Sequence, residues 1–487
     1  MRGAATRRPA ADRRPHPPLR AFVAAGLLAA ALPALASTPE AALPEQRPDL
    51  SLIWGLPFAG LLLSIALAPL ATPRIWHAHY GKIAAAWALA FAVPFALVHG
   101  PGAMLHEVLH AILFEYLPFV AILFSLFTIA GGICVRGTLA GTPGRNTALL
   151  ALGAGLASVM GTTGASMLLI RPLLTANEGR RHRAHAVVFF ILLVGNVGGA
   201  LSPLGDPPLF IGYLKGVEFF WTTRALALPT LLLAGALLAV FWLLDAWFYR
   251  HEQRLSLPAT AAPKLAIEGW VNVPLLAGVV AAVLLSGTWD PGISWDVIGA
   301  PLELQNVVRD VLLVAFALLS LALTPRAARE HNQFHWAPIV EVARIFACIF
   351  VAIIPVLAIL EAGRAGALGA VIELVVDADG RPRDTMIFWT AGLLSSFLDN
   401  APTYLVFFNL AGGDAQRLMG PLASSLAALS MGAVYFGALT YIGNAPNFMI
   451  KAIAEDRGVA MPSFFGYFAY AGAVMLPLLA IIGWLFL

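Results

Sequence analysis

The most chemically distinctive stretch of the chain is residues 202–208, which read Ser-Pro-Leu-Gly-Asp-Pro-Pro inside an apolar region. Three prolines and a glycine in seven residues cannot continue a helix. A backbone that unwinds inside a membrane frees carbonyl oxygens, and carbonyls beside a carboxylate can bind a cation. Because a carboxylate is costly within a membrane, it marks a functional site by default. Asp206 is therefore the first candidate for an ion-binding residue.

A second carboxylate, Asp399, lies in the sequence Asp-Asn-Ala-Pro, which interrupts another apolar region. A site carboxylate that binds either a proton or a cation is enough for antiport, because the competition couples the two fluxes. Either aspartate could instead cap a half-helix, and hydroxyls and amides also bridge membrane helices. The other candidate site residues are polar groups and glycines near the same breaks: Thr162, Thr163, Asn196, Ser202, Gly205, Asn400, Thr403, Thr440, Gly443, Asn444 and Asn447.

A different chemistry is suggested by His106, Glu107 and His110, which match the pattern His-Glu-x-x-His. On a helix this spacing can place two histidines around Zn²⁺ with the glutamate as general base, as in metalloproteases. The polar face of an amphipathic stretch explains the same residues without a metal. We expect the second interpretation, because a protease gives no role to the internal repeat described below.

Other charged or reactive residues receive weaker interpretations. Arg171 could pair with a site carboxylate or an anionic substrate, or extend to the membrane interface. Asp245 is expected to reach the interface, because it lies near the end of an apolar segment, and Glu341 is expected to be interfacial or structural. Cys134 and Cys348 both lie in apolar segments and are expected to be small buried residues rather than a disulfide or a metal pair.

Composition sets the class of protein. The chain has 487 residues, of which 59% are apolar and only 12% are charged. Soluble domains have about 45–50% apolar and about 25% charged residues. This excludes a soluble enzyme, a disordered chain and a nucleic-acid-binding protein. We predict an all-α polytopic membrane protein with roughly 10–12 transmembrane segments, given about 20 apolar residues per span, in a bacterial inner (cell) membrane.

The distribution of basic loops predicts the orientation of the segments. Five loops are rich in basic residues, and counting spans from a cytoplasmic N-terminus places all five in the cytoplasm. These loops are 72–82, 136–145, 180–183, 250–264 and 324–336. The apolar segments themselves are 52–70, 83–98, 116–135, 186–201, 225–248, 269–287, 309–323, 337–360, 420–440 and 464–487.

The N-terminus has the layout of a secretory signal. Six arginines and an apolar run ending in Ala-Leu-Ala lie within residues 1–36. We expect a signal peptide or an uncleaved N-terminal anchor there, followed by a linker at 37–50 on the outside.

Two regions predict re-entrant hairpins instead of simple spans. Residues 145–175 and 384–416 are apolar but interrupted, and the two ends of each fall on one side of the membrane. Residues 199–210 align with 437–448, where six of twelve positions are identical. The same alignment places the first interruption, 161–165, on the second, 399–403. Because the two copies would cross the membrane in opposite directions, we predict an inverted repeat with broken helices and a midplane site, as in secondary transporters.

The predicted organisation follows from the repeat. A first repeat spans 51–250, with its hairpin at about 145–175 and its broken helix at about 186–215. A linker and connecting helix occupy 251–308. A second repeat spans 309–487, with its hairpin at about 384–416 and its broken helix at about 420–454.

These motifs resemble a known family. Residues 195–206 resemble the broken-helix motif of NhaD-type Na⁺/H⁺ antiporters, and residues 394–402 resemble their second-hairpin motif. Both belong to the wider ion-transporter superfamily, which includes citrate, dicarboxylate and arsenite carriers. The resemblance extends over most of residues 50–487. Within the superfamily, the chain resembles a branch described as citrate transport or sodium:proton antiport. The resemblance implies two inverted repeats, each with a hairpin and a broken helix, often dimeric through a scaffold domain.

The chain departs from the pattern at two places. Pro207 and Pro208 replace the threonine-rich sequence that antiporters carry there, and neither hairpin has the Ser-Asn-Thr of carboxylate carriers. We predict a secondary transporter, not an enzyme, that exchanges Na⁺ or Li⁺ for H⁺. The alternative is cation-coupled transport of citrate or another small carboxylate, in which Arg171 or half-helix N-termini would meet the anion. No cofactor beyond the transported Na⁺ and H⁺ is expected, and the partners would be monovalent cations or a carboxylate, the lipid bilayer and a second copy, with no nucleic acid.

Overall fold

The computed structural model describes residues 50–137, 140–252, 266–363, 366–377 and 381–487. The predicted signal or anchor at 1–36 and all but the last residue of the linker at 37–50 lie outside this part. The described chain is almost entirely helical, and its few strands form two short antiparallel pairs, β1–β2 and β3–β4. This confirms the predicted all-α polytopic fold class.

The first half of the chain contains one series of helices. Its elements are η2 (Leu52–Gly55), α2 (Leu56–Ala71), α3 (Pro73–His99), α4 (Pro101–His110), η3 (Ala111–Tyr116), α5 (Leu117–Ala130), β1 (Cys134–Arg136), α6 (Pro143–Met160), α7 (Thr162–Ala176), α8 (Ala184–Leu193), η4 (Val197–Leu201), α9 (Pro207–Leu214) and α10 (Phe219–His251).

The second half contains a related series. Its elements are β2 (Ala266–Glu268), α11 (Asn272–Thr288), β3 (Ser294–Val297), β4 (Ala300–Glu303), α12 (Leu304–Leu323), α13 (Arg326–His331), α14 (Ala337–Ala352), α15 (Ile354–Glu361), α16 (Gly369–Val375), α17 (Asp384–Phe397), α18 (Asn400–Leu410), α19 (Ala415–Met419), α20 (Ala423–Phe436), η6 (Gly437–Leu439), α21 (Ala445–Asp456) and α22 (Phe464–Phe486).

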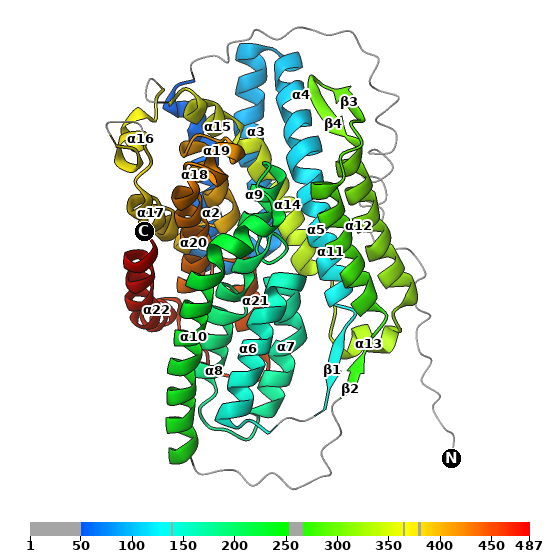
Figure 1. Cartoon of the computed structure of the whole chain (residues 1–487), viewed down its shortest axis with the longest axis vertical. Helices are drawn as coiled ribbons and strands as arrows, with labels where there is room; N and C mark the ends of the chain where they lie inside the picture. Colours follow the sequence, from blue (N-terminus) through cyan, green and yellow to red (C-terminus); the bar gives the residue numbers. More distant parts are fainter. Residues whose placement is uncertain (1–49, 138–139, 253–265, 364–365, 378–380) are drawn as a thin grey trace, which may run out of the picture.

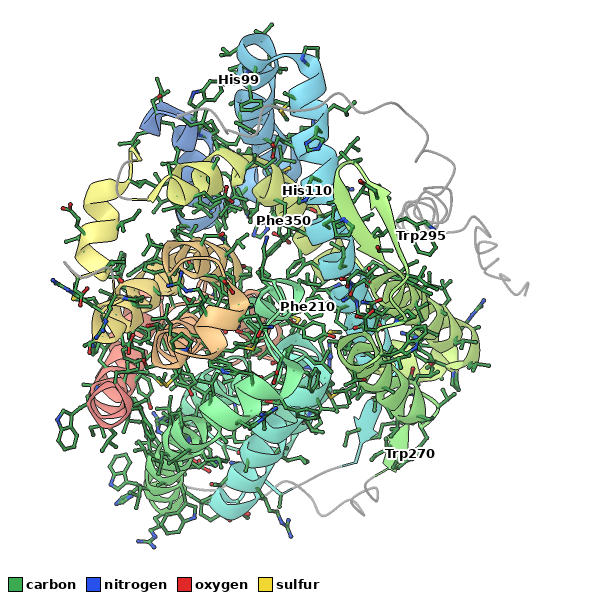
Figure 2. The ribbon with its side chains drawn as sticks, turned by 45° about the horizontal axis from the view of Figure 1, so that its top comes forward. His99, His110, Phe210, Trp270, Trp295 and Phe350 are labelled. Carbon is green, nitrogen blue, oxygen red and sulfur yellow. The ribbon has the colours of Figure 1, made fainter. Side chains whose placement is uncertain are left out.

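The membrane-spanning segments agree with the apolar segments of the sequence. Among the described residues, eight helices are long and apolar enough to cross a membrane, and two shorter apolar helices, Asn272–Thr288 and Ala423–Leu439, accompany them. Each of the ten predicted segments overlaps one of these helices. Exposed Trp270 and Trp295 lie toward opposite ends of the molecule (Figure 2), as aromatic side chains do at the two membrane interfaces.

The basic loops mark one end of the molecule. β1, β2 and α13, which belong to or adjoin basic loops, lie at the lower end in Figure 1, and β3 and β4 lie at the upper end. We call these the inner and the outer end. Arg136 and His331 both contact Glu268 at the inner end, with closest N···O distances of 2.9 and 2.8 Å. The hydrogen bonds from Arg136 and His331 hold the pKa of Glu268 below its ordinary value.

Each of the two regions predicted to be a hairpin is a pair of helices with a sharp break between them. Gly161, with φ of +79°, separates α6 from α7, and only glycine adopts such a φ without strain. Leu398 and Asp399 separate α17 from α18. The first hairpin lies in the lower half of the molecule, and α18 and α19 lie in the upper half (Figure 1).

One sequence offset relates the elements of the two halves. Asp206 and Asn444 are 238 residues apart, and this offset is called the repeat offset below. It places α6 on α17, α7 on α18, α8 on α20, η4 on η6 and α9 on α21, with starts that agree to within three residues, and α10 on α22, which starts seven residues later than the offset predicts. The backbone repeats in detail, because Asp206 and Asn444 are the extended N-caps of α9 and α21. Each broken helix packs against the hairpin of the other half, α9 against α18 and α21 against α7. The site therefore lies where the two halves cross.

Paired glycines allow each helix to break so tightly. A Cβ built on Gly205 would lie 2.1 Å from the carbonyl oxygen of Gly199, and one on Gly443 would lie 2.7 Å from that of Gly437. These four glycines form two of the six identical pairs of the repeat. At Gly205 and Gly443 a larger residue would clash with backbone atoms.

We expect Gly205→Ala to destabilise the protein by about 3 kcal/mol, at the upper end of overpacking costs. The clash is with backbone, which cannot move aside as a flexible side chain can. Gly155→Ala is the matched control, because a Cβ on Gly155 of α6 meets nothing within 4 Å. The melting temperature in detergent should fall for Gly205→Ala and remain or rise slightly for Gly155→Ala. Equal melting temperatures for the two variants would contradict this explanation.

Candidate functional site

Asp206 lies at the centre of the candidate site. It precedes Pro207 and Pro208, which begin α9, and only 1% of its surface is exposed. Its Oδ1 accepts hydrogen bonds from Thr162 Oγ1 at 3.2 Å and Asn444 Nδ2 at 2.9 Å. Its Oδ2 accepts one from Asn400 Nδ2 at 2.5 Å. The four side chains come from α7, α18 and the starts of α9 and α21, so the carboxylate joins both hairpins to both broken helices.

Asp399 lies at the tip of the second hairpin. Its Oδ1 accepts a hydrogen bond from the backbone N–H of Ala401 at 3.1 Å, which makes it the N-cap of α18. Thr403 donates to the backbone carbonyl of Asp399 at 3.1 Å. The capping role that the sequence left open is therefore real for Asp399. The same residue also lines the cavity described next, so the cap does not exclude a second role.

A cavity of about 440 Å³ connects the site to the inner end. Its deep end is lined by Asp206, Asp399, Thr162, Thr163 and Asn444. Phe210 of α9, which also lines the cavity, lies near the middle of the molecule (Figure 2). Toward the inner end the walls come from the later half of α7, the first half of α14 and the last turn of α21. The site is thus reached from the inner end in this conformation.

Two of the predicted site residues, Asn196 and Asn447, form no hydrogen bond with Asp206 among the described residues and instead bond to each other and to the backbone. Asn196 Nδ2 donates to Asn447 Oδ1 at 2.8 Å and to the carbonyl of Ile191 at 2.8 Å, and its Oδ1 accepts from Asn444 Nδ2 at 3.2 Å. Asn447 Nδ2 donates to the carbonyls of Gly437 and Thr440, both at 2.8 Å. The amides of Asn196 and Asn447 are thereby committed to fixing the two broken helices together.

Ser202 and Thr440 hold the turns that precede the two half-helices. The hydroxyl of Ser202 donates to the carbonyl of Ser158, and that of Thr440 donates to the carbonyl of Ser396. These are equivalent bonds under the repeat, and each ties a broken helix to the hairpin of its own half. Together with Gly205 and Gly443 they shape the backbone around the site.

Arg171 lines the same cavity as the two aspartates. It donates from Nε to Gln333 Oε1 at 3.3 Å and from Nη1 to Asn332 Oδ1 at 3.1 Å and to the carbonyl of Met167 at 3.4 Å. All of these acceptors are neutral, and among the described residues no carboxylate forms an ion pair with it. Among the described residues, the cavity therefore has a guanidinium without an ion pair, together with Glu341 and Asp456, toward the inner end, and two further carboxylates at its depth.

The cavity has further polar walls that the sequence did not assign to it. Glu341, which we expected to be interfacial or structural, lines the inner half together with His77, His335 and Asp456. The available signal was a glutamate within the first turns of an apolar segment. That signal does not say which face of the helix carries the glutamate.

The expectation for Asp245 was wrong. Its side chain is fully buried, where Oδ1 contacts Arg180 Nη1 at 2.6 Å and His185 Nε2 at 2.8 Å, and Oδ2 accepts from Asn146 Nδ2 at 2.9 Å. Arg180 continues to Glu252 at 3.2 Å. The loop after α7 covers this part of α10, so the carboxylate pairs inside the protein and does not reach the interface.

The His-Glu-x-x-His pattern does not gather the residues of a metalloprotease. His106 Nε2 lies 3.1 Å from the carbonyl oxygen of Ile298. His110 lies on α4 toward the outer end, away from Phe210 at the centre (Figure 2). Within the described ranges, no cluster of three or more His, Cys, Asp or Glu residues could hold a metal ion. Cys134 and Cys348 are both free thiols.

The charged group of the site is the carboxylate of Asp206, and neutral side chains that can rotate donate hydrogen bonds to it. A buried carboxylate receives one hydroxyl and two amide donors, and within the described chain the Oδ1 atom of Asn400 is buried without a hydrogen-bond partner. An amide with a free oxygen beside a carboxylate can turn to offer that oxygen to a cation. The arrangement can therefore bind either a proton or a small cation at Asp206.

Comparison with known proteins supports a role in transport. The model of the family described as "Putative citrate transport" matches residues 47–487. The chain belongs to this family. No curated protein matches the chain. The match includes all the helices described here, so both hairpins and both broken helices are parts of a membrane transport protein.

Proposed function

We propose that this protein is a secondary transporter of a small carboxylate such as citrate, driven by a cation or proton that binds at Asp206 in a bacterial inner membrane. The observation that carries the proposal is the shared cavity. One space contains the guanidinium of Arg171, whose acceptors are neutral, and the carboxylates of Asp206 and Asp399. An anion and its coupling cation can enter it from the same end, and the family description supports citrate as the first anion to test.

The physical argument rests on charge compensation. Asp206 is stabilised by three hydrogen-bond donors, all of them neutral hydroxyl or amide groups. Binding of H⁺ or Na⁺ would neutralise Asp206, and the guanidinium of Arg171 would offset one negative charge of a bound carboxylate. The loaded site would then carry less uncompensated charge across the membrane than the carboxylate alone.

A second candidate function is exchange of Na⁺ or Li⁺ for H⁺, without an anion. The observation that favours it is the pair of acidic residues, Asp206 and Asp399, at one cavity end. In this case Arg171 would have no substrate to meet, and its replacement would leave the flux unchanged. The two candidates therefore differ in what they predict for one residue.

The test is flux into proteoliposomes of the purified protein. Internal pH and labelled citrate uptake would be followed after adding Na⁺, Li⁺, K⁺ or citrate in turn, with and without a pH gradient. Citrate uptake that requires Na⁺ or a proton gradient supports the proposal. Cation-driven proton movement without citrate supports antiport. Proteoliposomes that respond to none of these additions would contradict both.

We expect Arg171→Gln to raise the KM for citrate by about tenfold, as expected for losing a charge-assisted contact of about 1.5–3 kcal/mol. The maximal rate should change less, because Arg171 lies toward the cavity mouth and away from Asp206. Arg181→Gln is the matched control, since Arg181 is exposed in the loop after α7. An Arg171→Gln protein with wild-type KM and rate for citrate would contradict the anion role.

A further inference from the structure

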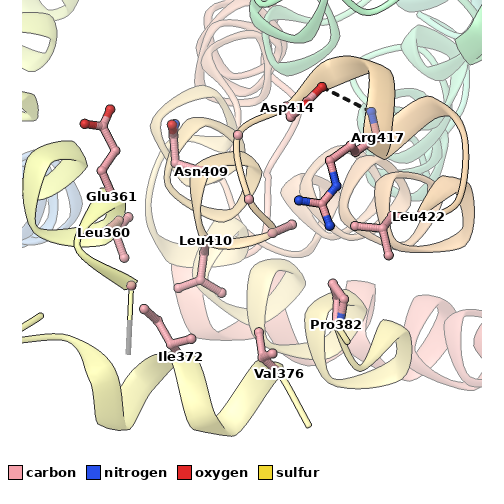
Figure 3. Close-up of a pocket in the computed structure, with 14 residues that line it drawn as sticks. Leu360, Glu361, Ile372, Val376, Pro382, Asn409, Leu410, Asp414, Arg417 and Leu422 are labelled. Carbon is pink, nitrogen blue, oxygen red and sulfur yellow. Dashed lines mark hydrogen bonds between the residues drawn. The ribbon is translucent and has the colours of Figure 1, made fainter. Parts of the chain in front are cut away.

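A second pocket lies at the outer end of the molecule. It has a volume of about 570 Å³ and is enclosed by the end of α15, by α16, and by the end of α18 with the turn that leads into α19. Asn409 and Arg417 project from α18 and α19, and Glu361 projects from α15 (Figure 3). The pocket shares no lining residue with the cavity that contains Asp206.

The internal repeat relates this pocket to the inner cavity. Under the repeat offset, Leu360 and Glu361 correspond to Ile122 and Leu123, and Asn409 corresponds to Arg171. Leu360, Glu361 and Asn409 line the outer pocket. Their three counterparts line the inner cavity. In the same way, α15 packs on α18 as α5 packs on α7. The two spaces thus occupy equivalent places on the two hairpins at opposite ends.

We infer that the outer pocket is the outer entrance to the Asp206 site, closed in this conformation. The inference rests on the proposed transport, but not on which ion is carried. The closed stretch is the part of α18 between Asn409 and Asp399, whose side chains, including Leu405, are almost all buried. On the first hairpin, the counterpart of Leu405 is Met167, which lines the inner cavity with 3% of its surface exposed, against 1% for Leu405. Opening the outer path would place Leu405 on its wall.

The outer pocket is lined by one arginine and by two acidic residues, Glu361 and Asp414. Arg417 lines it, and its guanidinium forms no ion pair within the described part of the chain. The carboxylate of Asp414 accepts hydrogen bonds from the backbone N–H groups of Gln416 at 2.8 Å and Arg417 at 3.1 Å, and Figure 3 shows the second of these bonds. Among the described residues, each access path therefore has one arginine that lacks an acidic partner, Arg171 at the inner end and Arg417 at the outer end.

Cysteine labelling tests the inference in a background with Cys134→Ser and Cys348→Ser. Leu405→Cys would be treated with a membrane-impermeant thiol reagent in intact cells, and Met167→Cys in inside-out vesicles. The matched controls are Phe408→Cys and Ile170→Cys, a repeat pair that is fully buried and lines neither space. Ser294→Cys on β3 is exposed and reports that the reagent reaches the outer face.

We expect Leu405→Cys to react from outside at least about tenfold faster than Phe408→Cys, because a minor outward-open state is accessible at equilibrium. Met167→Cys should react from inside. If Met167→Cys reacts and Leu405→Cys does not react from outside, the inference is overturned, whatever the cargo is. Absence of flux for every ion, with both cysteines reactive on their own sides, would overturn the proposed function and leave the entrance supported.

Asn409→Cys provides a second measurement if the Leu405 variant does not fold. Asn409 is half-buried at the pocket wall. A bulky impermeant reagent added from outside should block uptake through the modified protein by at least about tenfold, as the loss of a single access path would. Unchanged uptake after complete modification of Asn409→Cys would contradict an entrance at this place.

Discussion

Asp206→Asn is expected to abolish coupled transport, with a loss of at least about 100-fold, corresponding to about 3 kcal/mol of lost charge-assisted interactions. The substituted amide cannot bind a proton or attract a cation. It also turns an NH₂ group toward Asn400 or Asn444, whose own NH₂ groups lie 2.5 and 2.9 Å from the present carboxylate oxygens. The measurements are uptake of labelled citrate and Na⁺-dependent proton flux in proteoliposomes.

A matched control separates the site from a general loss of negative charge. Asp296→Asn removes an exposed carboxylate on β3 at the outer end. Its transport should equal that of the wild type. The melting temperature of Asp206→Asn in detergent would be measured in parallel, because the opposed NH₂ groups also cost stability. Coupled uptake by Asp206→Asn at a wild-type rate would remove Asp206 from the coupling site.

The repeat offers a stricter version of this test. Asn444 is the counterpart of Asp206, and the amide nitrogen of Asn444 lies 2.9 Å from the carboxylate oxygen. The double variant Asp206→Asn with Asn444→Asp moves the carboxylate across this contact and keeps the same groups. We expect it to recover part of the activity, because Asn196, Thr162 and Asn400 still surround the pair. If the double variant transports no faster than Asp206→Asn alone, the coupling depends on a carboxylate at the start of α9 and not only on one at the crossing.

The elements of the fold could be predicted from local sequence. Apolar length located the ten segments, and proline and glycine located both breaks, because these residues restrict the backbone wherever they occur. The alignment of the two repeat copies identified Asp206 and Asn444 as equivalent positions before their contact was visible. These signals are all contained within a few neighbouring residues, or in the comparison of two such stretches.

The partners across the site could not be predicted in the same way. Asn400 and Asp206 are 194 residues apart, and Asn196 and Asn447 are 251 apart. Which amide meets the carboxylate and which meets another amide depends on how α18 and α21 pack against the first half. All four asparagines appeared in one candidate set, since each is a polar residue near a break. Only the packing separates Asn400 and Asn444, which contact Asp206, from Asn447, which holds Asn196.

Asp245 shows why position within a segment is a poor guide to burial. A carboxylate near the end of an apolar helix could extend to water, and the sequence alone favoured that outcome. The loop at 177–183 folds back over α10 and supplies Arg180, and α8 supplies His185. The signal that was present is the group of basic residues at 180–185. Basic residues beside an apolar segment are expected in a cytoplasmic loop, and they are equally expected where they pair with a buried carboxylate.

Asp245→Ala is expected to destabilise the protein by about 3 kcal/mol, the lower end for a broken buried ion pair, because Arg180 loses its fully buried partner but keeps its pair with Glu252. The side chain of Asp245 is fully buried and that of Arg180 is 9% exposed. Asn146 and His185 would lose an acceptor as well. This network joins α6, the end of α7, α8 and α10, so its loss should loosen the first hairpin. The measurement is the melting temperature in detergent, with protein yield from membranes.

The triple variant Arg180→Met, Asp245→Leu and Glu252→Gln tests whether the cost comes from the stranded charge, since Arg180 also pairs with Glu252. Replacing a buried ion pair by apolar residues of similar size is often neutral or stabilising, whereas removing one partner is strongly destabilising. We therefore expect the triple variant to melt above Asp245→Ala. Lys451→Ala is the comparison at the same end of the molecule, since its pair with Glu455 at 2.8 Å is partly exposed and surface pairs contribute about 0–1 kcal/mol. If Asp245→Ala melted like Lys451→Ala, the buried network would not stabilise the first hairpin, and the burial of four polar side chains there would have to serve its movement instead.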